Sequence, residues 1–169
     1  MRYRAPLLIL LASLLASAAV AASPPLTPFG LGLLKIGMRE ADAARRLGLR
    51  IAPDDEVNGW ECRLDELPGH PGLSVMVERG VVTRIGIASP SRLKTDRGFG
   101  IGAREADLRR AYGKALKVAT AAYEAEPAHD LTVWAIRGKR GVRYGTDARG
   151  RVQAIYAGSK SIANIEGCL

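Results

Sequence analysis

IGMREADAARRLG, at residues 36–48, returns as IGAREADLRRAYG at residues 101–113. With an offset of 65 between the two segments, eight of the thirteen positions hold the same amino acid. Agreement this dense within one chain indicates an internal repeat. The repeated segment decides the fold, because each copy is expected to build the same local structure.

Each copy has the charge pattern of a short helix. Acidic residues fall in the first turn and arginines in the last, which suits the helix macrodipole. Asp42 with Arg46, and Glu105 with Arg109, have the i,i+4 spacing of favourable salt bridges. A glycine closes each copy, as is common after a helix. We therefore expect two equivalent helices, at residues 39–47 and 104–112.

The segments around these helices have the alternation of strands. Residues 73–89 hold two alternating runs around Arg79-Gly80, and residues 131–158 hold three; these patterns predict a hairpin and an antiparallel meander. Shorter strands are expected before the helices, at residues 30–36 and 98–101.

The fold class follows from the shortness of the helices. A helix of about ten residues is not stable alone in water, so it must pack on a sheet. We expect an α+β fold of two tandem repeats, each a short helix on an antiparallel sheet, within one compact unit. The expected repeats are residues 23–93 and residues 94–169.

Residues 1–22 have the pattern of a cleaved secretory signal peptide. Two arginines precede an apolar run at residues 7–20, and small residues follow it. This run is shorter than the roughly 20 residues that span a bilayer, and neither cysteine stands just after it, where a lipid would be attached. We expect a periplasmic or secreted protein with no transmembrane anchor in its mature form.

The sequence holds two cysteines, Cys62 and Cys168. In an exported chain the simplest expectation is a disulfide between them. Two buried free thiols, or one reactive cysteine, are the alternatives. The spacing of the cysteines matches neither a redox motif nor a zinc site.

The chain carries an excess of basic residues. Without the leader, 23 Lys and Arg stand against 17 Asp and Glu, a net charge of +6. The basic residues are spread along the chain and few aromatic residues lie among them. This pattern favours a solvated basic surface over a nucleic-acid interface, so no specific nucleic-acid partner is expected.

The repeated motif resembles a known superfamily. Gly-Met followed by Leu-Gly at residues 37–48, with its copy ending in Tyr-Gly at residue 113, is similar to the helix motif of the beta-lactamase inhibitory protein-like and SmpA/OmlA (BamE)-like proteins. The chain also resembles exported bacterial proteins with this doubled motif, a Trp-x-Cys at residues 60–62 and a terminal Glu-Gly-Cys at residues 166–168. The resemblance implies a tandem-repeat α+β fold and a role in inhibiting or assembling other proteins.

The chain departs from that superfamily at two points. Arg39 and Arg104 stand where the family usually has Thr or Ser, whose hydroxyl caps the helix. The absent lipidation cysteine argues against the membrane-anchored assembly factors. No inhibitory residue can be transferred, because the inhibitors bind through residues outside the shared motif.

The sequence offers little for catalysis. His129 and Asp130 are adjacent, and with a nearby hydroxyl or thiol they are the basis of a small-hydrolase hypothesis. No G-x-S-x-G motif supports it, and an exposed loop is the simpler interpretation of both His70 and His129. The acidic cluster at residues 54–56 lacks the spaced oxygen donors of a calcium loop, so no catalytic residue, metal or cofactor is expected.

Recognition of another molecule is the function that the sequence favours. If the helices cover one sheet face, the other face is left open, as antiparallel sheets allow. Trp60, Met76 and Trp134 are the candidate partner-binding residues on it, since Trp is favoured at binding hot spots; packing in the core is their alternative role. The leading hypothesis is an exported non-enzymatic module that binds an unknown protein or envelope component. An outer-membrane assembly or structural factor is the second, and the hydrolase the third.

Overall fold

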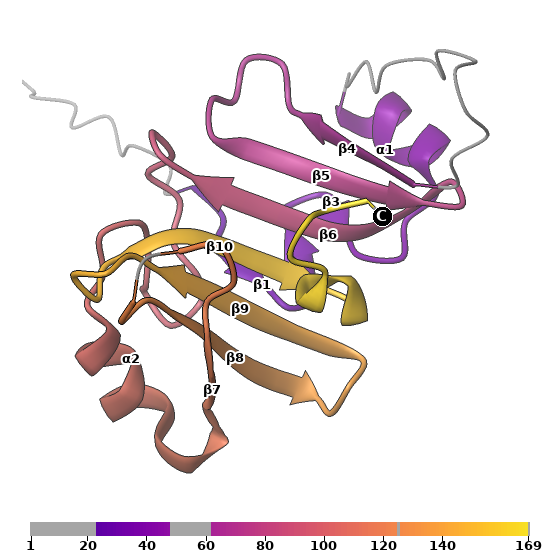
Figure 1. The fold of residues 1–169 in the computed structure, drawn as a ribbon. Coiled ribbons are helices and arrows are strands. Elements are labelled where there is room, and N and C mark those ends of the chain that lie inside the picture. The colour runs from indigo at the N-terminus through magenta and orange to yellow at the C-terminus, as the bar shows by residue number, and fades with distance from the viewer. Residues whose placement is uncertain (1–22, 48–61, 125, 169) are drawn as a thin grey trace, which may run out of the picture.

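The structure is a computed structural model that describes residues 23–47, 62–124 and 126–168 (Figure 1). The expected signal peptide at residues 1–22 and the candidate residue Trp60 lie outside the described residues. No helix within the described ranges is both long and apolar enough to cross a membrane.

The fold is α+β, as the sequence predicts, with two antiparallel sheets. The small sheet has the order β1-β2-β3 and contains β1 (Leu26–Thr27), β2 (Gly30–Leu31) and β3 (Leu34–Lys35). The large sheet has the order β4-β5-β6-β10-β9-β8-β7. Its strands are β4 (Cys62–Glu66), β5 (Leu73–Glu78), β6 (Val81–Ala88), β7 (Lys117–Thr120), β8 (His129–Ile136), β9 (Arg140–Thr146) and β10 (Val152–Gly158). The helices are α1 (Glu40–Leu47) and α2 (Glu105–Tyr112), with the 3-10 turns η1 (Gly113–Ala115) and η2 (Lys160–Ala163).

The predicted hairpin and meander are present in the large sheet. Arg79 and Gly80 join β5 to β6, with φ values of 51° and 70°, and positive φ at both central residues is typical of a tight hairpin turn. β8, β9 and β10 pair in sequence order. The two halves of the chain meet where β6 pairs with β10, with Ile87 opposite Ile155.

Each helix is attached to a central strand in the same way. The Gly37 N–H donates to the carbonyl oxygen of Val82 at 2.7 Å, and the Gly102 N–H donates to that of Val152 at 2.7 Å. Gly37 and Gly102 have φ values of 92° and 82°, a region that favours glycine. The glycine of the repeated segment therefore turns the chain from the sheet into the helix.

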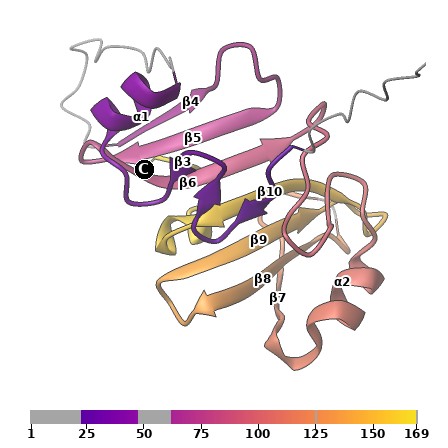
Figure 2. The ribbon, with the colours of Figure 1, turned by 180° about the vertical axis from the view of Figure 1, so that it is seen from behind.

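The main core lies between the large sheet and a layer formed by the helices and the small sheet, which faces the viewer in Figure 2. Ala43 is the buried residue of α1 and Leu108 that of α2, both with 0% exposure. The large sheet supplies most of the other members of this core: Leu73, Val75, Val77, Val82, Ile85, Ile87, Leu131, Val142, Tyr144, Val152, Ile155 and Ala157.

Two of the short strands differ from the prediction. Residues 30–36 form β2 and β3 separated by a turn, and Gly30 approaches β3 so closely that an added Cβ would lie 2.2 Å from the carbonyl oxygen of Leu34. Residues 98–101 form no strand. Gly98 donates to Thr95 in a turn, with a φ of 82°, and only an isolated bridge joins Gly100 to Lys94.

Candidate functional site

Met76 and Trp134, the two described residues proposed for an open sheet face, do not form one. Met76 has 0% exposure, so its placement as a partner-binding residue is wrong for the folded chain. Trp134 is half-buried, and its ring packs over Gly141. A Cβ atom added at Gly141 would lie 2.8 Å from the Trp134 ring and 3.1 Å from Ile162. The face that carries both residues is covered by other parts of the chain.

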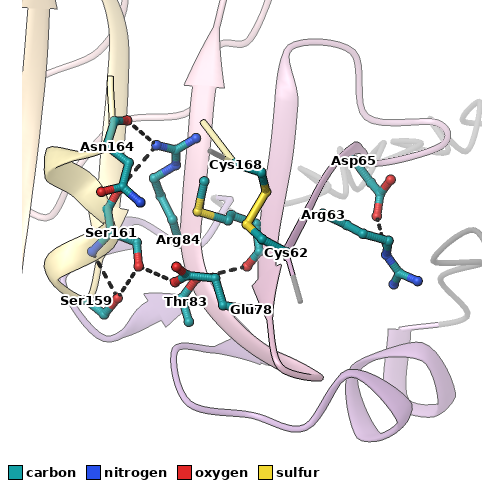
Figure 3. Close-up of a disulfide and its surroundings, with 11 residues drawn as sticks. Cys62, Arg63, Asp65, Glu78, Thr83, Arg84, Ser159, Ser161, Asn164 and Cys168 are labelled. Atoms are coloured by element: carbon teal, nitrogen blue, oxygen red, sulfur yellow. Dashed lines mark hydrogen bonds and ion pairs between the residues drawn. A yellow bond between two sulfur atoms is a disulfide. The ribbon is translucent and has the colours of Figure 1, made fainter. Parts of the chain in front are cut away.

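The cover is a C-terminal strap, residues 159–168, that crosses the sheet face opposite the helices (Figure 3). Arg84 of β6 points toward the strap, and its Nη1 donates to the carbonyl oxygen of Asn164 at 2.7 Å and to that of Ser161 at 3.3 Å. The Ser161 hydroxyl also donates to Glu78. The predicted disulfide between Cys62 and Cys168 is present and fixes the end of the strap to β4.

Two buried arginines explain why this face needs a cover. Arg84 and Arg143 are 3% and 5% exposed, and their guanidinium carbons lie 4.9 Å and 4.6 Å from the centre of the Tyr156 ring. Burial lowers the pKa of Arg84, since leaving water disfavours its charged form. Buried charges require hydrogen-bond partners, and the strap carbonyls supply them to Arg84.

His129 and Asp130 are not brought together. They are consecutive residues of β8, so their side chains point to opposite faces of the sheet. Nδ1 of His129 lies 3.0 Å from Oε2 of Glu105, on the helix side. Oδ2 of Asp130 lies 3.5 Å from Nη1 of Arg143, on the strap side. The hydrolase hypothesis therefore has no assembled His-Asp pair in the described part of the chain.

His129 instead borders a groove with a cationic rim, which we call the arginine groove. It has a volume of about 530 Å³ and lies between α2, the start of β8 and the turn that joins β9 to β10. Its lining consists of Arg104, Glu105, Ala106, Arg109, Pro127, His129, Ala148, Arg149, Gly150 and Arg151.

Three of the four arginines are held by neighbouring groups. Nε of Arg109 donates to Glu105 at 2.7 Å, and Nε of Arg104 donates to Asp107 at 2.9 Å. Nη1 of Arg151 donates to the carbonyl oxygen of Gly102 at 3.2 Å. The predicted Glu105–Arg109 pair is thus present, whereas Asp42 of α1 pairs with Arg45.

The groove has the chemistry of a carboxylate-binding site. The lining contains four arginines and a single carboxylate, that of Glu105. Burial opposes ionisation of Glu105, but hydrogen bonds from Arg109 and His129 outweigh it and lower the pKa of the carboxyl below its usual range. Guanidinium groups bind carboxylates through two parallel hydrogen bonds, and the remaining lining of Ala106, Pro127 and Ala148 is apolar.

The sequence alone does not reveal this groove, although Arg104 and Arg109 lie in the repeated segment. An isolated antiparallel bridge between Arg104 and Arg151 forms the groove, and no local pattern in the sequence predicts a contact between residues so far apart in the chain. No protein-family model, curated protein sequence or solved structure matches the chain.

Proposed function

We propose that this protein is an exported, non-enzymatic binding module that captures an acidic segment of a partner protein in the arginine groove. The observation that carries the proposal is the grouping of Arg104, Arg109, Arg149 and Arg151 around an apolar lining. A positive net charge of +6 on the chain without its leader would attract such a partner and speed its association.

The apolar lining favours a peptide over a highly charged polymer. Ala106, Pro127 and Ala148 offer contact to the methylene groups of Glu or to neighbouring apolar residues. A phosphate or sulfate polymer gains little from such contacts, because its affinity comes mainly from charge. An acidic protein segment uses both parts of the groove.

Export and a recognition role have separate support. The leader-like residues 1–22 and the disulfide between Cys62 and Cys168 agree with a periplasmic or secreted location. The resemblance of the repeated motif to inhibitory and assembly proteins agrees with a role in binding other proteins. An outer-membrane assembly function stays the second proposal, to be decided by the identity of the captured protein.

Charge reversal in the groove tests the proposal. The probe is a fluorescent peptide of alternating Glu and Leu, titrated at about 0.15 M salt, where long-range attraction is screened. Arg149→Glu with Arg151→Glu is expected to weaken binding by at least about tenfold. The control, Arg92→Glu with Arg137→Glu, makes the same charge change at exposed positions outside the groove and should keep most of the affinity.

Two results would contradict the proposal. Equal weakening by the two double variants would show a general effect of charge. Tighter binding of inorganic polyphosphate than of the peptide, lost in the same groove variant, would assign the groove to an anionic polymer.

A further inference from the structure

A second cavity, which we call the strap cavity, lies on the sheet face opposite the arginine groove. Its volume is about 220 Å³, and the loop at residues 121–124, strands β8 to β10 and Ile165 of the strap surround it. Asp130 lines this cavity, whereas its neighbour His129 lines the arginine groove. The two sites are therefore separate.

Small residues create the space in the strap cavity. Ala121, Ala122, Gly145 and Ala154 lie around it and carry no atoms beyond Cβ. Each water molecule in the liquid occupies about 30 Å³, so the cavity has room for about seven waters or a molecule of similar volume. Tyr156, stacked against Arg143, forms part of the wall.

A buried arginine beside the cavity is incompletely paired. Arg143 is 5% exposed, its Nε has no hydrogen-bond partner among the described residues, and its contact with Asp130 is long, at 3.5 Å. Burial raises the pKa of Asp130, although Arg143 opposes the shift. A buried donor without a partner destabilises the fold, so Arg143 would gain from an acceptor on a ligand, and Asp130 lies in the same cavity.

We propose that the strap cavity binds a small zwitterion of the α-amino acid class, with its carboxylate on Arg143 and its ammonium group on Asp130. The protein pair is neutral as a whole, and a ligand with one charge of each sign keeps it neutral. An anion alone would pair with Arg143 but lie beside the Asp130 carboxylate, and a cation alone would pair with Asp130 but lie beside Arg143. The carboxylate of such a ligand supplies an acceptor to Arg143, and its ammonium group is attracted by the Asp130 carboxylate.

The rim of the cavity suits a ligand that enters beside the strap. Nε2 of Gln153 donates to Glu124 at 2.8 Å, and the Tyr123 hydroxyl donates to Glu166. These contacts link exposed side chains, so they can open without disrupting the core. The ligand site therefore lies within reach of solvent.

The test is titration of the folded protein with each of the twenty protein L-amino acids, with acetate and with ethylamine, followed by NMR. At least one amino acid is expected to bind with a Kd below about 10 mM. Acetate and ethylamine should each bind at least about tenfold more weakly than that amino acid. Equal binding of acetate would overturn the proposal in favour of a simple anion site, and so would the absence of binding by all twenty.

Matched variants locate the binding. Ala154→Leu fills the cavity from β10. Ala122→Leu narrows the cavity from the loop and leaves the sheet unchanged, so it serves as the second variant if Ala154→Leu does not fold. Each variant that folds should weaken amino-acid binding by at least about tenfold. Ala106→Leu, the same substitution in the arginine groove, should leave amino-acid binding unchanged. Unchanged binding in a folded cavity variant would place the ligand elsewhere and refute the assignment.

Discussion

Glu105 connects the helix, the sheet and the arginine groove through one side chain. Its carboxylate accepts from Arg109 at 2.7 Å and lies 3.0 Å from Nδ1 of His129 and 3.5 Å from the Thr146 hydroxyl. The side chain is only 13% exposed. These contacts fix Arg109 at the rim of the groove and hold α2 against β8 and β9.

The lowered pKa of Glu105 predicts a pH dependence of stability. Because the folded-state pKa lies below the ordinary value of 4.5, the stabilisation is present above that value and is lost as the pH falls. The free energy of unfolding should decrease from about pH 5 to about pH 3 more steeply in the wild type than in Glu105→Gln. Urea titrations across this range measure it. Glu66→Gln, at an exposed position of β4, is the control and should keep the wild-type slope.

The helices α1 and α2 carry different side chains at the equivalent position that each buries in the core. The buried residue is Ala43 in α1 and Leu108 in α2, which align at the offset of 65 between the copies. A methyl group suffices to fill the space under α1, whereas α2 needs a larger side chain. The two similar helices therefore pack on the two halves of the sheet through side chains of different size.

Exchange of these two side chains should destabilise both halves. Leu108→Ala leaves a cavity and should lower the free energy of unfolding by about 2–5 kcal/mol. Ala43→Leu adds volume to a filled space and should lower it by about 1–3 kcal/mol. Urea unfolding midpoints measure both effects, with exposed Ala106→Leu as the control, expected within about 0.5 kcal/mol. A neutral Ala43→Leu would show that α1 is loosely packed.

Local patterns were sufficient to predict the helices and hairpins but not the two sites. The charges of the repeated segment place α1 and α2, and Arg79-Gly80 places the tight turn, because these features act over a few residues. The groove requires the long-range bridge between Arg104 and Arg151. The cover over the sheet face likewise depends on contacts between Arg84 of β6 and the strap, which no periodicity encodes.

The whole molecule is closed by one covalent link across the sheet. The strap leaves β10 at the centre of the large sheet and ends at Cys168, which is bonded to Cys62 on the edge strand β4. Between these points it supplies carbonyl oxygens to Arg84. The disulfide therefore joins the two halves of the chain and holds the strap over a buried charge.

Removal of the disulfide should weaken the whole fold and the strap most of all. The bond closes a loop with a sequence separation of 106, and loss of such a loop costs about 4–5 kcal/mol in the chain-entropy model. Cys62→Ser with Cys168→Ser should unfold at a lower urea concentration than the oxidised wild type. Hydrogen exchange at about pH 7 should accelerate more at the Ile162 and Asn164 amides, whose bonds lie within the strap, than at the amides that pair β6 with β10. Equal acceleration at both sets of amides in the folded variant would contradict this prediction. It would show that the strap unfolds together with the central strands, and that the disulfide stabilises the protein only by restricting the unfolded chain.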